Sequence, residues 1–147
     1  MNDSYTYDAF ISFVGADQAW VQRELLPRLA AADLRYALSD LSAGITPARL
    51  QDTETLIRES RRLIAVLSTN YLADGMAKFE NMIAQTLDFQ EMTLRVIPLI
   101  AAPFERELLP TRLALLAAAD LTDPAKRERR FAELVEVLHS PLPKMDD

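Results

Sequence analysis

An apolar run, Tyr7-Asp-Ala-Phe-Ile-Ser-Phe13, is followed directly by a turn of small residues and one acid, Val14-Gly-Ala-Asp17. This pattern predicts a buried strand that delivers its loop to a ligand crevice. A second segment, Arg61-Arg-Leu-Ile-Ala-Val-Leu-Ser-Thr-Asn-Tyr71, repeats the design, and a predicted helix containing Glu80 follows it. Two strand ends and one helix carboxylate are therefore the candidate functional positions.

Strand and helix patterns alternate along the whole chain. The expected strands cover residues 7–13, 34–39, 62–68, 94–100 and 119–121, and the expected helices residues 17–32, 48–60, 75–92, 108–118 and 122–139. Asp17 is expected to cap the first helix, and Pro27 to kink or shorten it. Pro98 has no amide donor, which predicts a place near the end of its strand or at a non-bonded position. Pro124 is expected near the first position of the last helix.

These elements predict an α/β fold of the flavodoxin-like, doubly wound type. Strands that are apolar on both faces and separated by helices imply parallel pairing, with helices on both faces of the sheet. For five strands the common order is 2-1-3-4-5, and ligands then bind at the carboxyl ends of strands 1 and 3, where the order reverses. The crevice is expected between residues 14–17 and 68–75, with Glu80 projecting into it.

Composition limits the class of protein. The 147 residues are expected to form one domain over residues 1–139, with the Pro-rich and charged residues 140–147 as a tail or the start of a linker. The absence of cysteine excludes disulfides, thiolate catalysis and cysteine-ligated metal. The net charge of −6 argues against a nucleic-acid partner, because phosphate binding relies on clustered Lys and Arg. A polar start and the lack of an apolar run of ~18 residues predict a cytoplasmic protein without a membrane segment.

Most catalytic arrangements are also excluded. The single histidine, His139, falls at the end of the last predicted helix, far in sequence from the crevice, so the usual nucleophile–base pairs cannot form. The three glycines belong to no phosphate-binding fingerprint, and clustered carboxylates for a metal are missing. A phospho-receiver needs an aspartate where the third strand ends, but that strand ends Leu67-Ser-Thr69. One carboxylate, Glu80, remains.

Four pieces of the chain, in order, resemble a Toll/interleukin-1 receptor (TIR) domain of the bacterial, NAD-hydrolysing type, and the resemblance covers nearly the whole chain. The opening strand is similar to the family's first box, and with Gly15 and Asp17 it approaches the plant-like phrase Phe-x-Ser-Phe-Arg-Gly-x-Asp. Leu41-Ser-Ala-Gly44 resembles the Leu-x-x-Gly of the family's BB loop, which follows the second strand. Leu56-Ile-Arg-Glu-Ser-Arg61 and the later Ser68-Thr-Asn-Tyr-Leu72 resemble the remaining two pieces.

The resemblance implies an NAD⁺ glycohydrolase that releases nicotinamide and forms ADP-ribose or a cyclic isomer. The family's catalytic glutamate on the third helix corresponds to Glu80 in Met76-Ala-Lys-Phe-Glu80. The resemblance also implies a substrate site formed by Phe13, Val14, Gly15, Asp17, Asp40, Leu41, Gly44, Ile45, Met76 and Phe79, with NAD⁺ as substrate and neither a cofactor nor a metal. Activity in the family requires self-association through the BB loop, here Asp40 to Pro47, and neighbouring helices.

The implied setting is bacterial antiphage defence, in which a fused or associated sensor domain clusters the enzyme. The Ala-, Leu- and Arg-rich composition agrees with a GC-rich bacterial source.

Departures from the family pattern leave an alternative open, a non-catalytic signalling module that assembles through the BB loop. Met76 replaces the usual tryptophan, and Val14 stands where plant members carry arginine. Phe79 is a second possible ring for nicotinamide, but its spacing with Ile83 and Leu87 favours a core position. Measuring nicotinamide release separates the two functions.

Overall fold

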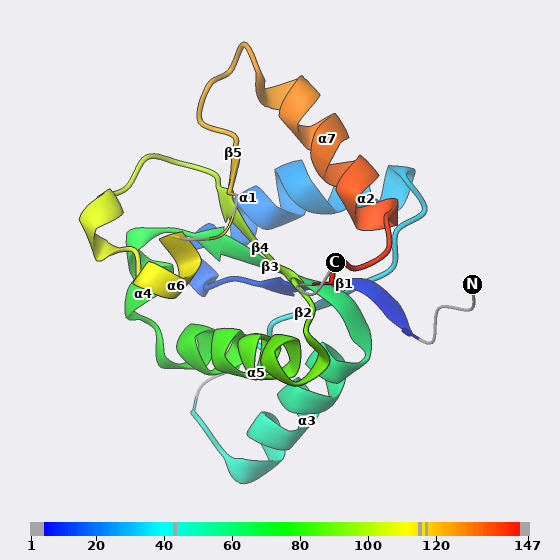
Figure 1. Ribbon diagram of the computed structural model, residues 1–147. Coiled ribbons are helices and arrows are strands. Elements are labelled where there is room, and N and C mark those ends of the chain that lie inside the picture. The colour runs from blue at the N-terminus through cyan, green and yellow to red at the C-terminus, as the bar shows by residue number, and fades with distance from the viewer. Residues whose placement is uncertain (1–4, 43, 115, 117, 145–147) are drawn as a thin grey trace.

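The computed structural model describes residues 5–42, 44–114, 116 and 118–144 (Figure 1). Its strands are β1 (Tyr7–Ser12), β2 (Tyr36–Leu38), β3 (Ser60–Leu67), β4 (Val96–Ile100) and β5 (Ala119–Asp120). They form one parallel sheet in the order β2-β1-β3-β4-β5, which confirms the predicted topology. The reversal of strand order therefore lies between β1 and β3.

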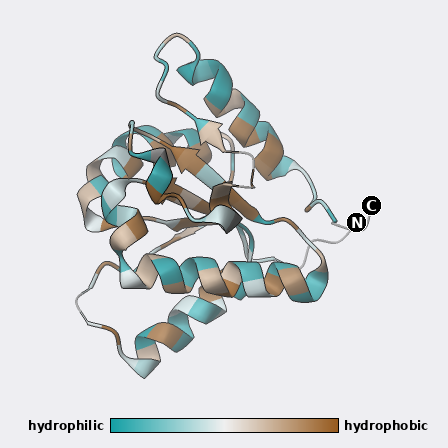
Figure 2. Cartoon of the chain, turned by 60° about the vertical axis from the view of Figure 1, so that its left-hand side comes forward, coloured by the Kyte–Doolittle hydropathy of each residue, from teal (hydrophilic) through white to brown (hydrophobic). Residues whose placement is uncertain are grey.

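Helices cover both faces of this sheet. They are α1 (Gln18–Trp20), α2 (Leu26–Ala31), α3 (Pro47–Arg58), α4 (Thr69–Ala73), α5 (Gly75–Glu91), α6 (Thr111–Ala114) and α7 (Arg127–His139). Helices α1, α2 and α7 lie on one face, and α3 and α5 on the other (Figure 1). Figure 2 shows the hydrophobic residues gathered on the strands between these layers.

Successive side chains of each strand alternate between the two faces of the sheet and so contribute to two hydrophobic cores, one on each face. In β1, Ala9 and Ile11 pack with α2 and α7, whereas Phe10 between them packs with α3 and α5. In β3, Ile64 joins the first core and Leu63 the second. Because successive side chains of a strand point to opposite faces, an unbroken apolar strand supplies both cores at once.

The first predicted helix is divided into segments. A 3-10 helix, η1 (Gly15–Asp17), leads into α1, and a π-helical segment, η2 (Val21–Leu25), connects α1 to α2. Pro27 lies in the first turn of α2, so its missing amide coincides with the break. The predicted capping role of Asp17 is wrong, because its carboxylate accepts a hydrogen bond from Ser68 Oγ (2.7 Å) and makes no cap bond.

The second half of the chain departs further from prediction. The helix expected over residues 108–118 is wrong in extent: it is reduced to the 3-10 helix η3 (Arg106–Leu108) and α6, which begins directly after Pro110. Positions 115 and 117 of that prediction lie outside the described residues. Helix α7 begins at Arg127 rather than near Pro124, which sits in a preceding turn closed by Lys126 N donating to Asp123 O (3.0 Å). Pro98 lies in the middle of β4 rather than near its end. Because β5 pairs only with Leu99 and Ile100, the missing amide of Pro98 costs no hydrogen bond to β5, which agrees with the predicted non-bonded position.

A buried ion pair closes the connection from α5 to β4. Asp88, near the end of α5, accepts hydrogen bonds from Thr93 Oγ1 (2.7 Å) and Arg95 Nε (2.9 Å). Arg95 is 1% exposed. Met92 adopts a left-handed conformation (φ 55°) that ends the helix, so the chain turns sharply around the pair.

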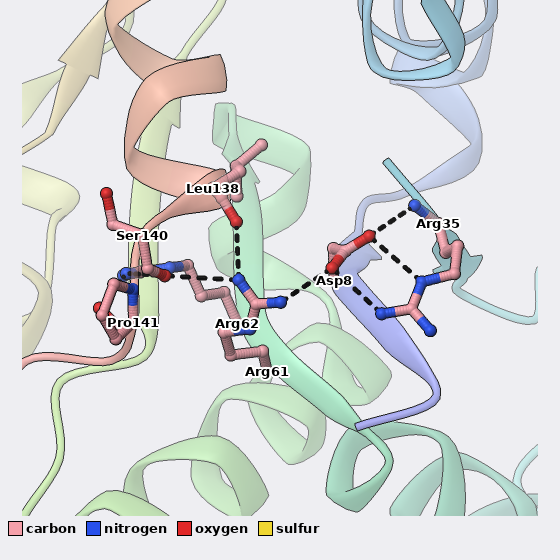
Figure 3. Close-up of polar contacts among 7 residues, drawn as sticks. All are labelled: Asp8, Arg35, Arg61, Arg62, Leu138, Ser140 and Pro141. Atoms are coloured by element: carbon pink, nitrogen blue, oxygen red, sulfur yellow. Dashed lines mark hydrogen bonds and ion pairs between the residues drawn. The ribbon is translucent and has the colours of Figure 1, made fainter. Parts of the chain in front are cut away.

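The amino ends of the strands are tied together by arginines (Figure 3). Asp8 of β1 accepts from Arg35 Nη2 (3.2 Å) and Arg61 Nη2 (2.9 Å), which links β1 to β3 and to the residue before β2. Arg61 and Arg62 also donate to main-chain carbonyls in the last turn of α7, at Leu138, and directly after it, at Ser140 and Pro141. Residues 140–141 are thus held at the amino ends of the strands, and the carboxyl ends are left for a ligand.

Candidate functional site

Glu80 lies where the topology predicts a ligand site. It is in the second turn of α5, whose first turn is capped by Asp74 accepting from Ala77 N (2.9 Å). The side chain reaches Ser12, the last residue of β1, and only 1% of the residue is exposed. The carboxylate therefore sits over the carboxyl end of the central strand, beside the reversal of strand order.

The two oxygens of this carboxylate have different surroundings. Oε1 accepts hydrogen bonds from Ser12 Oγ (2.6 Å) and Ser39 Oγ (2.9 Å). Oε2 is buried and has no hydrogen-bond partner among the described residues. Burial raises the pKa of Glu80 to about 7, although the two serine hydroxyls oppose that effect; Asp74 adds to it and Arg49 lowers it. The group is therefore divided between its acid and carboxylate forms near neutral pH.

Two further polar side chains lie behind Ser12. Tyr71 of α4 contacts Ser12 through an oxygen–oxygen distance of 2.7 Å. Asn81 donates through Nδ2 to the Tyr71 hydroxyl and to the carbonyl oxygen of Ala77 (2.9 Å). Burial raises the pKa of Tyr71, so this residue stays a phenol at physiological pH.

A cavity of about 310 Å³ opens beside the carboxylate. Nine of the predicted site residues line it, namely Phe13, Val14, Gly15, Asp40, Leu41, Gly44, Ile45, Met76 and Glu80. Two predicted residues do not. Asp17 is bound to Ser68 instead, and the half-buried Phe79 is absent from the lining.

Six other residues complete the lining: Ser39, Ser42, Arg49, Asp74, Gly75 and Ala77. Asp74 and Gly75 belong to the expected wall 68–75 and Ser42 to the BB loop, whereas the sequence analysis did not identify Ser39, Arg49 and Ala77 as site residues. Arg49 is the most informative because it supports the BB loop. It donates to the carbonyl oxygens of Asp40 and Gly44, and its Nε lies 3.7 Å from Asp40 Oδ2. Gly44 has a φ of +87°, a conformation that favours glycine. A local feature of the sequence could have identified Arg49. It lies two residues after Pro47, in the first turn of α3, the helix that follows the BB loop.

The BB loop presents apolar side chains at the mouth of the cavity. Leu41 is 39% exposed and Ile45 is 59% exposed. Residue 43 of the loop lies outside the described part of the chain. Exposed aliphatic side chains beside a cavity mark a surface suited to contact with a ligand or another protein.

Other regions offer less chemistry. A larger hollow of about 590 Å³ lies between β4, β5 and α7, lined mainly by apolar residues, and Glu80 is not part of it. Trp20 stacks on Phe131 of α7 with ring centroids 6.3 Å apart, which is a packing role. Across the described residues no group of acids and histidines is arranged to hold a metal, and no helix is long and apolar enough to cross a membrane.

Comparison with known proteins identifies the family. The sequence model described as "TIR domain" matches residues 9–135. Toll-like receptor 6 of Dasypus novemcinctus is 29% identical over 104 residues, which are 71% of this chain and 13% of the receptor. Toll-like receptor 1 of Homo sapiens is 28% identical over 105 residues, again 71% of this chain and 13% of the receptor. The chain thus spans a small part of these curated relatives.

Solved structures show the same fold. The TIR domain of the Toll-related receptor TRR-2 from Hydra magnipapillata superimposes with a TM-score of 0.73 at 21% identity, covering 92% of this chain and all of that one (100%). A metazoan TIR-STING receptor from C. gigas, in complex with 2',3'-cGAMP, gives 0.70 at 19% identity over 98% of this chain and 43% of that one. The TIR domains of the activated Roq1 resistosome give 0.64 at 17% identity over 90% of this chain and 99% of theirs.

Proposed function

This chain belongs to the TIR domain family, and from that premise we propose that it is an NAD⁺ glycohydrolase activated by self-association. The products are nicotinamide and either ADP-ribose or a cyclic isomer of it. The observation that carries the proposal is the state of Glu80. Its carboxylate is buried beside a cavity at the carboxyl end of β1, and one of its oxygens has no protein partner among the described residues.

A single carboxylate is sufficient for this chemistry. Nicotinamide in NAD⁺ is bound through a cationic ring nitrogen, so it leaves as a neutral base when the bond to the ribose C1′ breaks and needs no proton. The electron deficiency passes to an oxocarbenium ion on the ribose, which an ionised Glu80 stabilises electrostatically. Water, or a nitrogen of the adenine ring, then attacks C1′, and Glu80 accepts the proton that water releases.

The pKa of Glu80 suits both tasks. A value of about 7 keeps a large fraction ionised at neutral pH while leaving the group basic enough to accept a proton. A carboxylate exposed to water would be fully ionised but a weaker base. Burial beneath the loop and the two serine hydrogen bonds together set this compromise.

Other residues of the cavity suit parts of the substrate. Phe13 and Met76 offer apolar contacts to the nicotinamide ring, and a thioether packs favourably against aromatic rings. Arg49 supplies a positive charge for the diphosphate. It thereby replaces the cation that Val14 lacks relative to plant members of the family.

The size of the cavity supports a requirement for self-association. At about 310 Å³ it is at the low end of the roughly 300–1,000 Å³ of small-molecule sites. This is room for the nicotinamide riboside part, but the remainder of a dinucleotide extends past the mouth. A second copy contributing its BB loop there would cover the substrate and bury Leu41 and Ile45, both of which are exposed in the single chain.

The exposed loop also favours the second candidate function, a signalling module that assembles without catalysis. Leu41 and Ile45 are suited to homotypic contacts whether or not NAD⁺ is cleaved. The similarity to Toll-like receptors is compatible with that function. The two candidates differ in what Glu80 does.

Nicotinamide release from NAD⁺ by concentrated or crowded protein tests the proposal. Glu80→Ala and Glu80→Gln are expected to lower the rate by about 10²-fold or more, because the charge at the reacting carbon is lost. Glu136→Gln, an exposed change on α7, is the matched control and is expected to retain the wild-type rate. Absence of nicotinamide release from wild-type protein even when it is forced to oligomerise would favour the assembly module.

We place this activity in cytoplasmic immune defence, with clustering by a sensor domain as the activating event. Expression of the chain fused to an inducible dimeriser should then deplete cellular NAD⁺ and stop growth. The same fusion carrying Glu80→Ala should do neither. Growth arrest by both fusions would separate toxicity from NAD⁺ cleavage and count against this role.

A further inference from the structure

The polar groups behind Glu80 form a continuous chain of hydrogen bonds. It runs from Asn81 through the hydroxyls of Tyr71 and Ser12 to Glu80 Oε1. A serine hydroxyl has only one hydrogen to donate. Since Ser12 donates it to Glu80 Oε1 at 2.6 Å, Ser12 must accept the hydrogen of the Tyr71 hydroxyl across 2.7 Å.

The direction of this chain is fixed at its far end by main chain. Asn81 Nδ2 donates to the carbonyl oxygen of Ala77 at 2.9 Å as well as to the Tyr71 hydroxyl. Rotating the amide by half a turn would set its oxygen against the Ala77 carbonyl, which cannot donate. Tyr71 therefore receives a hydrogen from Asn81 and passes its own to Ser12.

This direction distinguishes the two oxygens of Glu80. A proton on Oε1 that points at Ser12 would reverse the hydrogen of Ser12 and turn the Tyr71 hydrogen toward the hydrogens of Asn81, in a buried site. A proton on Oε1 that points at Ser39 would leave the Ser39 hydrogen only the carbonyl oxygen of Ile11, at the longer distance of 3.2 Å. Oε1 is therefore favoured as an acceptor, since it receives two hydroxyl hydrogens at 2.6 and 2.9 Å. Protonation and contact with a ligand fall to Oε2, the oxygen without a hydrogen-bond partner among the described residues.

We propose that Tyr71 and Asn81, acting through Ser12, are positioning residues that stabilise the ionised form of Glu80 and present Oε2 as its reactive oxygen. The inference deepens the proposed function, and its kinetic test, the pH profile of kcat for nicotinamide release, rests on that function. Its structural readout, the titration of Glu80 itself, does not. Tyr71 and Asn81 touch neither the cavity mouth nor its loop, so they act on the substrate only through Glu80.

The other groups that act on Glu80 lie on separate elements. Ser39, after β2, is an uncharged donor, Asp74 precedes α5 and Arg49 belongs to α3. None of the three has a described side-chain hydrogen bond to Tyr71 or Asn81; Asp74 is linked to Tyr71 only through the main chain, where its amide donates to the Tyr71 carbonyl oxygen (3.1 Å). Removal of the Tyr71 hydroxyl therefore leaves them in place, and a change in the titration of Glu80 reports the chain through Ser12.

The test is a carbon-detected NMR titration of the Glu80 carboxyl, assigned by comparison with Glu80→Gln. Tyr71→Phe and Asn81→Leu are each expected to raise its midpoint by about half a pH unit or more, because Ser12 becomes a weaker donor to the carboxylate. Tyr7→Phe removes a hydroxyl at the opposite end of β1 and is the matched control, with no expected change. The pH profile of kcat for nicotinamide release should move in the same direction.

Folded Tyr71→Phe and Asn81→Leu proteins with an unchanged midpoint would overturn the inference. If neither variant folds, the wild-type protein decides: a slowly exchanging Tyr71 hydroxyl proton with nuclear Overhauser contacts to Ser12 supports the chain, and contacts to Asn81 instead refute it. A shifted midpoint in protein that releases no nicotinamide would uphold the positioning role and refute the proposed enzyme.

Discussion

The Glu80→Gln protein should gain stability relative to the wild type as the pH rises. Glutamine keeps the shape of the side chain and an oxygen that accepts from Ser12, but it carries no charge. In the wild-type protein the buried carboxylate must ionise as the pH increases, and burial makes this costly. The residue that we propose as catalytic is therefore also a source of instability.

The size of the effect follows from the two states of the carboxyl. Burial raises the pKa of Glu80 from the ordinary 4.5 to about 7 in the folded protein. Between these values the folded protein binds more protons here than the unfolded chain, so wild-type stability falls as the pH rises through that window. From pH ~5.5 to ~8.5 the loss is about 2 kcal/mol.

Urea denaturation at these two pH values, followed through the fluorescence of Trp20, measures this difference. Glutamine's amide lacks a partner at the position of Oε2, which costs about 1 kcal/mol at either pH and cancels in the comparison. The free energy of unfolding of Glu80→Gln minus that of wild type should therefore rise by about 2 kcal/mol between the two pH values. A rise below about 0.5 kcal/mol would refute the raised pKa, and Glu136→Gln should show none.

Three further perturbations test other parts of the structure. Arg95→Met should lower the free energy of unfolding by about 3–5 kcal/mol, because it leaves the buried carboxylate of Asp88 without its cationic partner. Arg58→Met, in an exposed ion pair, should cost about 0.5 kcal/mol or less, and equal effects of the two changes in urea titrations would contradict this. Arg49→Ala should raise KM for NAD⁺ more than it lowers kcat, and a change in kcat alone would exclude a phosphate-binding role. Leu41→Ser and Ile45→Ser should leave stability within about 0.5 kcal/mol but reduce both self-association in light scattering and nicotinamide release; full activity in the monomeric variants would argue against completion of the site by a second copy.

The architecture was largely predictable because it depends on short-range patterns. A strand that is apolar throughout, such as β3, indicates burial on both faces of the sheet. Such burial predicts parallel pairing with intervening helices. The position of Glu80 followed from topology, since the helix after β3 must pass over the carboxyl ends of the strands. The weakest prediction was the helix at 108–118, where a leucine-rich pattern favoured a long helix but the described residues include only the end of η3 and the short α6.

The inner face of α5 shows the limit of reasoning from periodicity. Spacing favoured Phe79, Ile83 and Leu87 as a single apolar stripe, and this is confirmed for Leu87 and Ile83, which pack in the second core, but not for Phe79. Phe79 and Ile83 are half-buried, while Glu80 and Asn81 are buried. Hydropathy alone cannot identify a face whose buried members are polar, because their burial depends on partners supplied elsewhere in the fold.

The sequence by itself determined the strand order and the helix that carries the acid, since both follow from local pattern or from topology, and its resemblance to the TIR family supplied most residues around the cavity. Only the tertiary structure decided the chemical state of Glu80. Its partners Ser12 and Ser39 are 68 and 41 residues away in the chain, and Tyr71 is 59 residues from Ser12. A carboxylate's pKa and the oxygen that it presents depend on burial and on the direction of hydrogen bonds among such distant groups, and these exist only once the strands and helices have packed.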